Sequence, residues 1–186
     1  MAREEIKEAG EALKRGETLL YLSDTIWGIG CDPKNEEAVQ KIIEIKERPI
    51  DKSFIVLISE IGQLYNYVND IPEVAWDIIE FAEDPLTIIF SGAKNLPKKV
   101  IASDGSIAIR LVKDPDCKRL VQLSRNGLLS TSANISGQPS PKAYSEISSA
   151  ILNGVDYIVN SSKESKNKSS KIIKLGTDGE FELIRN

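Results

Sequence analysis

One short stretch of the chain combines small polar side chains with glycines, directly after a predicted buried strand at residues 18–22. Its members are Ser23, Asp24, Thr25, Gly28 and Gly30. Two hydroxyls and a carboxylate at a strand end suit a small polar ligand better than a hydrophobic core. The glycines allow the backbone to turn or to approach another group closely. The alternative is a turn in which Ser23 and Asp24 hydrogen-bond only to the local backbone, and the stretch alone leaves both interpretations open.

Three cations, Lys46, Arg48 and Lys52, follow within seven residues at the predicted end of a helix. Cations at a helix C-terminus contribute roughly 0.3 to 1 kcal/mol, which accounts for Lys46. Lys52 lies beyond the helix-ending Pro49, so the helix explains it poorly. The three side chains could instead bind a polyphosphate, with the arginine forming bidentate contacts and the lysines acting as point charges.

Two further segments carry candidate ligand-binding groups. Arg110 lies inside an apolar strand, where arginine is rare unless it is paired or faces a ligand; the alternative is an edge strand with a surface salt bridge. Residues 130–141 form a second polar loop after a strand, which could line a nucleotide or amino-acid pocket or simply contain Asx and Ser turns. Arg185 ends the last predicted strand, where a solvated terminal charge explains it without a ligand.

Composition restricts the chemistry. The chain has no histidine, so it contains no Ser-His-Asp or Cys-His machinery and no histidine metal site. Its two cysteines make no disulfide framework and fit a reducing cytosol. A net charge of −4 argues against general nucleic-acid binding, although a local basic site remains compatible with it. No apolar run reaches membrane-spanning length and no leader pattern is present, so we expect a cytoplasmic protein with no membrane partner.

The order of elements predicts an α/β fold. A length of 186 residues favours one domain, residues 1–186. We expect strands at residues 18–22, 54–58, 86–90, 107–112, 128–131, 155–159, 171–175 and 181–184. We expect helices at 3–15, 35–48, 61–67, 70–81, 115–125 and up to 152, with Asn35 and Asp70 as N-caps. The final hairpin, through Thr177-Asp178-Gly179, makes the predicted sheet mixed.

These segments together resemble the YrdC family, the threonylcarbamoyl-AMP synthases. The first family motif, roughly Pro-Thr-Asp-Thr-x-Tyr/Trp-Gly-Leu-Gly, is similar to Leu22–Gly30. The Lys-x-Arg-Pro segment corresponds to Lys46–Pro49, with Lys52 following, and the arginine-bearing strand to Ser106–Arg110. The Ser-Ala-Asn-x-Ser-Gly motif is complete at Ser132–Gly137. The motifs occur in the family's order over most of the chain, which makes the resemblance specific.

The resemblance implies that L-threonine, bicarbonate and ATP give threonylcarbamoyl-AMP and pyrophosphate, with Mg²⁺ on the phosphates. Separate threonylcarbamoyl transferase proteins would then use the product to modify an adenosine beside the tRNA anticodon. The implied fold is a twisted mixed sheet flanked by helices, with a concave basic cleft that reconciles an acidic chain with anionic ligands. Neither half of the reaction needs a protein nucleophile, in agreement with the missing histidine.

Residue by residue, the resemblance assigns Thr25 to L-threonine, and Arg110 and Ser132 to L-threonine or its carbamate. Ser170 is a weaker match to a serine of the family's later substrate-binding segment. Asp24 is the nearest candidate for a general base, with a structural role in the loop as the alternative.

On the nucleotide side, the resemblance assigns the triphosphate to Arg48 and Lys52, with Lys46 nearby, and these three cations would carry catalysis. Asn134 would contact the nucleotide and Arg185 would reach ATP from the last strand. No protein ligand to a metal is implied.

Several departures limit the resemblance. Leu22-Ser23 replaces Pro-Thr, Ser53 replaces a frequent Pro, and Lys171 replaces a frequent Thr. The chain corresponds to the short, single-domain form, and in the absence of a second domain the polar run at 161–170 is a hypothetical partial lid. One alternative is a non-catalytic, RNA- or ribosome-associated binding module with weak RNA binding in the same cleft. Another is the carbamoyl-handling domain of hydrogenase maturation factors, whose zinc modules need more than two cysteines.

Overall fold

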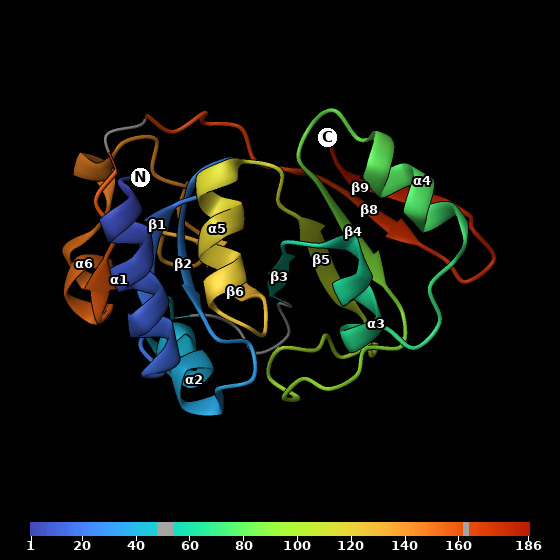
Figure 1. The fold of residues 1–186 in the computed structure, drawn as a ribbon, viewed down its shortest axis with the longest axis horizontal. Helices are drawn as coiled ribbons and strands as arrows, with labels where there is room; N and C mark the ends of the chain where they lie inside the picture. The colour runs from blue at the N-terminus through green and yellow to red at the C-terminus, as the bar shows by residue number, and fades with distance from the viewer. Residues whose placement is uncertain (48–53, 162–163) are drawn as a thin grey trace.

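A mixed sheet of nine strands forms the centre of the molecule in the computed structural model, which describes residues 1–47, 54–161 and 164–186 (Figure 1). The strands are β1 (Leu19–Leu22), β2 (Trp27–Cys31), β3 (Ile55–Ile58), β4 (Leu86–Phe90), β5 (Ile107–Leu111), β6 (Leu128–Ser132), β7 (Tyr157–Ile158), β8 (Lys171–Leu175) and β9 (Phe181–Arg185). Their order across the sheet is β7-β1-β2-β6-β3-β5-β4-β8-β9. The predicted twisted mixed sheet flanked by helices is confirmed.

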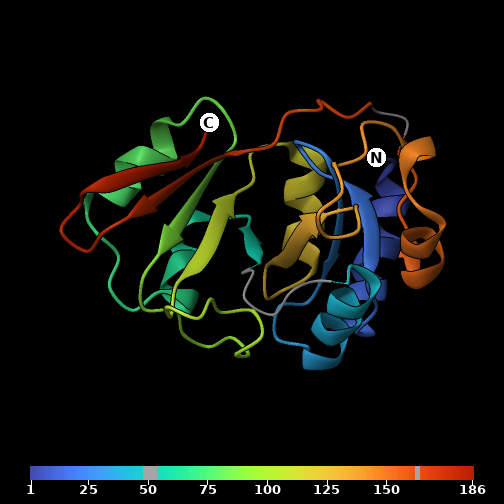
Figure 2. The same ribbon diagram turned by 180° about the vertical axis from the view of Figure 1, so that it is seen from behind.

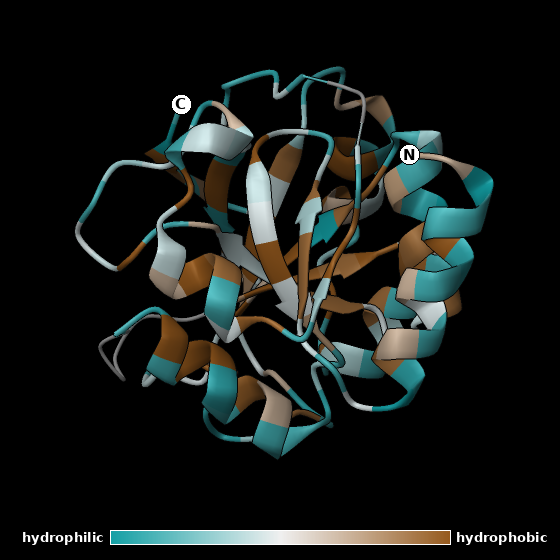
Figure 3. Cartoon of the chain, turned by 90° about the vertical axis from the view of Figure 1, so that its left-hand side faces the viewer, coloured by the Kyte–Doolittle hydropathy of each residue, from teal (hydrophilic) through white to brown (hydrophobic). Residues whose placement is uncertain are grey.

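Helices cover the sheet and bury its apolar side chains. They are α1 (Arg3–Lys14), α2 (Glu36–Ile45), α3 (Leu64–Tyr67), α4 (Val74–Phe81), α5 (Pro115–Leu123) and α6 (Ser149–Gly154), with the short helices η1 (Ile61–Gln63) and η2 (Tyr144–Glu146). α1 and α5 lie side by side (Figure 1). In the view from the opposite side, α2 lies nearer to the viewer than α1 (Figure 2). The strands are largely hydrophobic, whereas the helices carry hydrophilic outer surfaces (Figure 3).

The apolar side chains form two clusters. α1 and α5 share one with β1, in which Ile6, Leu19 and Leu120 are buried. The larger cluster joins α2, α3, α4 and α6 to the sheet, with Ile42 and Ile151 among its buried members. Apolar residues three and four positions apart share one side of a helix, and in α1 that side is buried through Ile6, Ala9 and Leu13. In α4 the buried residues are Ala75 and Ile79, whereas the apolar Val74 and Phe81 are exposed.

The residues after the polar turn form strand β2, which the sequence analysis had treated as loop. β2 pairs antiparallel with β1 and with β6, so Gly28 and Gly30 lie within a strand. A Cβ atom at residue 30 would lie 2.7 Å from the carbonyl oxygen of Leu129 and 3.1 Å from Cε1 of Tyr21. The predicted close approach is thus correct, and it is the approach of neighbouring strands. The sequence places antiparallel pairing only in the final hairpin, but β2 adds antiparallel pairs in another part of the sheet.

Three predicted boundaries were wrong. α4 begins at Val74 with Glu73 at its N-cap, so Asp70 does not cap it. The strand expected at 155–159 is reduced to β7, and the helix expected before 152 is divided into η2 and α6, the latter capped by Ser148. Asn35 does cap α2, accepting hydrogen bonds from two backbone amides in its first turn.

The chain segment at residues 164–170 crosses from the β7 side of the molecule to β8 along one edge (Figures 1 and 2). Ser165 Oγ donates to the backbone carbonyl of Thr25 over 3.3 Å, and Lys168 Nζ lies 3.4 Å from an oxygen of Asp84. The segment therefore touches the polar turn between β1 and β2. Across the described ranges, none of the helices has the length and apolar character needed to span a bilayer.

Candidate active site

A cavity of about 280 Å³ lies where the polar turn, the middle of the sheet and the end of the chain meet; we call it the main cavity. Its polar lining includes Ser23, Thr25, Arg110, Ser132, Ser170 and Arg185. Ile55, Leu57, Ala108 and Ile172 supply apolar lining from β3, β5 and β8. Five of the predicted site residues thus line one cavity, although 160 positions separate the first from the last.

The alternation of side chains along β5 puts Arg110 into the main cavity. Ile107 and Ile109 belong to the core under the helices, whereas Ala108 and Arg110 line the cavity. β5 lies between β3 and β4, so the alternative of an edge strand with a surface salt bridge is wrong. The side chain of Arg110 is only 4% exposed.

The guanidinium of Arg110 is held by two consecutive residues of the polar turn. Its Nη2 lies 2.9 Å from Oδ1 of Asp24, and its Nη1 donates to Oγ1 of Thr25 over 3.2 Å. The contact with Asp24 is an ion pair without hydrogen-bond geometry, and Nε has no hydrogen-bond partner within the described parts of the chain. A buried guanidinium nitrogen without a partner is unusual, and here it belongs to a side chain that lines a cavity.

Ser23 shapes the turn itself. Its Oγ accepts from the backbone amides of Thr25 and Ile26, each over 3.2 Å, and donates to the carbonyl of Ile26. The local-turn interpretation therefore holds for Ser23, while Asp24 and Thr25 face Arg110. The turn role is confirmed for Ser23, and ligand binding by this stretch stays a prediction.

Arg185 enters the main cavity from β9. Its Nε and Nη2 both donate to the backbone carbonyl of Ser170, over 3.0 and 2.8 Å. Burial lowers the pKa of the Arg185 guanidinium from its ordinary value, and the positive charge of Arg110 lowers it further. The Ser170 hydroxyl is buried against Thr87, 2.8 Å from its Oγ1. Two arginines close enough to repel each other favour an anionic ligand between or beside them.

Lys46 and Asn134 lie beside this cavity, outside its lining. Lys46 is 1% exposed, and its ammonium donates to the backbone carbonyls of Ser132 and Asn134. The Asn134 amide nitrogen donates to the carbonyls of Ile135 and Gln138, while its buried Oδ1 has no hydrogen-bond partner among the described residues. Both side chains organise the loop after β6, and their expected contacts with ATP stay predictions.

Arg48 and Lys52 lie outside the described residues, so the predicted triphosphate contacts are not addressed by the structure. The predicted basic character of the cleft likewise stays a prediction. Among the polar lining residues, Ser140 lies in the loop at 130–141 that the sequence marks as a possible pocket lining, and Ser169 lies in the polar run at 161–170, but neither is singled out as a site residue. Their only signal was a position in Ser-rich loops, which does not distinguish lining residues from solvated ones.

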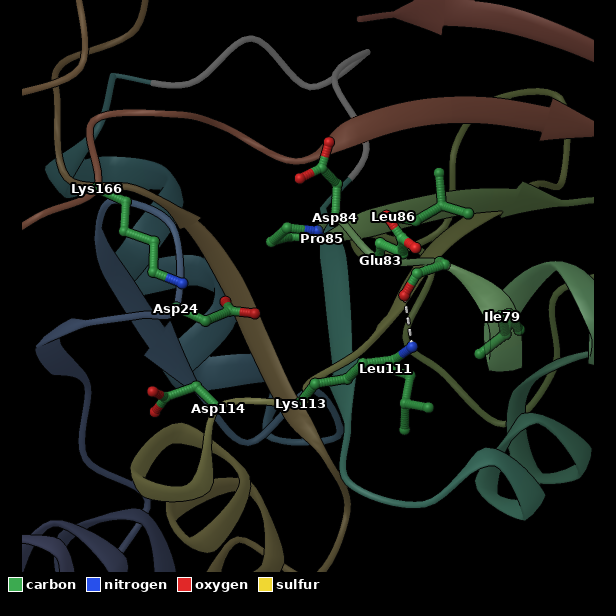
Figure 4. A pocket seen from close by; sticks show the side chains of 11 residues that line it. Asp24, Ile79, Glu83, Asp84, Pro85, Leu86, Leu111, Lys113, Asp114 and Lys166 are labelled. Carbon is green, nitrogen blue, oxygen red and sulfur yellow. Dashed lines mark hydrogen bonds between the residues drawn. The ribbon is translucent and has the colours of Figure 1, made fainter.

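A second cavity, of about 270 Å³, adjoins the polar turn and includes Asp24, Asp84, Lys113, Asp114 and Lys166 in its lining (Figure 4). Lys113 Nζ donates to the backbone carbonyls of Glu80 and Ala82 rather than to a carboxylate. Asp24 lines this second cavity while its partner Arg110 lines the main one. The ion pair therefore lies between the two cavities.

Comparison with known proteins shows the relationship of the chain. A family model described as "Telomere recombination", for Sua5, YciO and YrdC proteins, matches residues 11–186. A protein of Pseudoalteromonas translucida named threonylcarbamoyl-AMP synthase is 37% identical over 157 residues, which cover 83% of this chain and 84% of that protein.

Two solved structures of Sua5 from P. abyssi share the fold. A doubly substituted variant superposes with a TM-score of 0.89 at 26% identity, and the match covers 100% of this chain and 57% of the Sua5 chain. Sua5 complexed with L-threonine gives a TM-score of 0.84 at 27% identity, covering 91% of this chain and 50% of its own. The chain thus spans about half the length of these Sua5 chains, and most of the length of the P. translucida protein. By its sequence and by its fold, the chain belongs to the Sua5/YciO/YrdC family.

Proposed function

We propose that this protein is an L-threonylcarbamoyladenylate synthase, a nucleotidyltransferase that uses L-threonine, bicarbonate and ATP. The observation that carries the proposal is Arg110, buried in the main cavity with an unpartnered Nε among the described residues. The name of the P. translucida relative supports the same activity. The threonylcarbamoyl-AMP product would pass to threonylcarbamoyl transferase proteins for tRNA modification, which implies work in the cytoplasm.

L-Threonine is the proposed amino-acid substrate, as the complex of the P. abyssi neighbour suggests. A largely buried guanidinium is a strong partner for a carboxylate, so Arg110 would bind the substrate carboxylate. The hydroxyls of Thr25 and Ser132 lie in the same lining and would meet the other polar groups. The apolar strand residues Ile55, Leu57 and Ala108 would contact the non-polar part of the substrate.

ATP would bind at the other side of the main cavity. Arg185 is fixed by Ser170 and carries a positive charge into the lining. With Asn134, and with Arg48, Lys52 and nearby Lys46 as the sequence predicts, it would contact the nucleotide. Anchoring an arginine before the ligand arrives reduces the ordering cost of binding.

Mg²⁺ would enter as its complex with ATP. No cluster of three or more carboxylate or thiol side chains is placed to hold a metal ion in the described ranges. The arginines and hydroxyls of the cavity fit an ion held mainly by phosphate oxygens and water. When bound, the ion would neutralise charge on the departing pyrophosphate.

The reaction would proceed without a protein nucleophile. The amine nitrogen of L-threonine forms a bond to the carbon of bicarbonate, and the elements of water leave to give a carbamate. A carbamate oxygen then bonds to the α-phosphorus of ATP while the bond to the β-phosphate oxygen breaks, and pyrophosphate departs. Alignment of the reactants and stabilisation of the phosphate charge supply the acceleration.

The test is pyrophosphate release from ATP and Mg²⁺, with L-threonine and bicarbonate omitted in turn. We expect release only when both are present. Arg110→Gln should raise the KM for L-threonine at least about tenfold, because it removes the proposed carboxylate partner. Arg119→Gln, at an exposed position on α5, is the matched control and should leave the KM for L-threonine and the rate of pyrophosphate release unchanged.

Two results would overturn the proposal. Release that needs neither co-substrate would indicate an unrelated nucleotide hydrolase. No release from folded protein, together with salt-sensitive RNA binding that ATP does not displace, would favour the RNA-binding module instead.

A further inference from the structure

We infer that Asp24 is a positioning residue for substrate binding: its carboxylate holds the guanidinium of Arg110 in the orientation in which this side chain lines the main cavity. The inference rests on the proposed function, because it assumes that an amino-acid carboxylate binds Arg110. It assigns Asp24 a role other than general base or simple loop residue.

The geometry of the pair divides the donors of Arg110 into two sets. Asp24 and Thr25, neighbours in the chain, take Nη2 and Nη1 at 2.9 and 3.2 Å. Nε has no hydrogen-bond partner among the described residues. The side chains of Arg110 and Asp24 are 5% and 6% exposed, so the pair is largely shielded from solvent. The turn therefore fixes the orientation of the guanidinium through Nη1 and Nη2.

Asp24 holds Arg110 from outside the space that the ligand would occupy. It lines the second cavity, where Figure 4 shows its carboxylate among the other lining residues, whereas Thr25 and Arg110 line the main cavity. A carboxylate inside the main cavity would compete with the substrate carboxylate for the same donors. Placed behind the guanidinium, it orients the group without blocking it.

Charge gives a second reason for the pair. Arg110 shares the main cavity with Arg185, whose pKa its positive charge lowers. A buried guanidinium without a nearby anion is costly, and two in one cavity repel each other. Asp24 supplies a fixed negative charge beside the Arg110 guanidinium that keeps it in place before substrate arrives. Without it, we expect Arg110 to turn away from Arg185 and lose its orientation.

The test measures L-threonine affinity by calorimetry in Asp24→Asn, a substitution of nearly equal size. We expect the Kd for L-threonine to rise at least about tenfold and the Kd for ATP to change less than about twofold. L-Threoninol, which has no carboxylate, should bind wild type and Asp24→Asn equally. Asp84→Asn removes another carboxylate from the lining of the second cavity and should behave as wild type. A merely structural role would not separate the carboxylate-bearing ligand from the alcohol.

A cycle with Arg110→Gln tests whether Asp24 acts through Arg110. In that background, Asp24→Asn should change the Kd for L-threonine less than about twofold, because the group to be positioned is gone. This comparison also serves if Asp24→Asn alone does not fold, since the double variant contains neither buried charge. A further tenfold loss in the Arg110→Gln background would overturn the inference.

Unchanged or tighter L-threonine binding in folded Asp24→Asn would also overturn it, because Asp24 would then only neutralise Arg110. Wild-type protein that binds ATP but no L-threonine would overturn the proposed function as well. Wild-type binding of L-threonine with no effect of Asp24→Asn would overturn the positioning role alone. The two failures are thus distinguishable.

Discussion

The ammonium of Lys46, at the end of α2, is hydrogen-bonded to the backbone carbonyl of Ser132, 86 residues further along the chain. It also donates to the carbonyl of Asn134. These contacts join the end of a helix to the loop that carries the second polar motif. The family resemblance places this lysine near the triphosphate, and in the structure its ammonium binds backbone carbonyls beside the cavity.

We predict that Lys46→Met lowers the free energy of unfolding by about 3 kcal/mol, because hydrogen bonds from a charged donor are lost and buried carbonyls remain unpaired. Urea unfolding measures the change. Lys34→Met, at an exposed position before the same helix, should cost less than about 0.5 kcal/mol. Wild-type stability combined with lost ATP turnover in Lys46→Met would instead support the direct phosphate contact.

For Arg185, we predict that replacement by Lys raises the Kd for ATP about tenfold, or about 1.4 kcal/mol. Lysine keeps the charge but cannot place two donors on the Ser170 carbonyl, as Arg185 does over 3.0 and 2.8 Å. Calorimetric titration with ATP measures this, and L-threonine affinity should stay within about twofold of wild type. Equal ATP affinity in the two proteins would argue against the role of Arg185 in ATP binding.

We predict that Gly30→Ala destabilises the protein by about 2 to 3 kcal/mol, because a methyl group would press on the backbone of β6. The nearest atom would be the Leu129 carbonyl oxygen, at 2.7 Å. Gly62→Ala is the matched comparison, since nothing lies within 4 Å of an added Cβ there. It should leave stability unchanged or raise it by about 0.4 to 1 kcal/mol. Thermal melting of both variants tests this, and equal melting temperatures would contradict it.

Asp156 connects three distant elements through its carboxylate. It accepts hydrogen bonds from the backbone amide and the hydroxyl of Thr18, over 2.9 and 2.8 Å, and from Lys41. Burial opposes ionisation, but the Lys41 ammonium and the two donors of Thr18 outweigh it and lower the pKa of the carboxyl below its ordinary value of 3.8. A lowered pKa stabilises the fold above the ordinary value and stops doing so as pH falls through the lowered one.

We therefore predict that Asp156→Asn costs about 1 kcal/mol at pH 7, a modest figure because the side chain is one-third exposed. The difference from wild type should shrink as pH falls below 3.8. Urea unfolding at a series of pH values measures it, with the exposed carboxylate variant Asp70→Asn as control. A difference that stays constant down to pH 2.5 would show that charge plays no part.

The sequence by itself determined the α/β class, most of the helices, the hairpin of β8 and β9, and the family. These features are encoded locally. Asn35 caps α2 through amides two and three residues away, and the turn before β9 has a glycine with a φ of +89°. The family motifs are also short and contiguous, so reading them required no knowledge of contacts.

Only the tertiary structure decided which polar groups distant in the sequence contact each other. Thr25 and Arg110 are separated by 85 residues, and Lys46 and Ser132 by 86. The contact of Arg110 depends on strand register, because a shift of β5 by one residue would turn its side chain to the opposite face of the sheet. Strand β2 was missed for a related reason: its glycines are required by the closeness of Leu129, which belongs to another strand. Sequence specifies the candidates, and long-range strand pairing specifies which of them form the site.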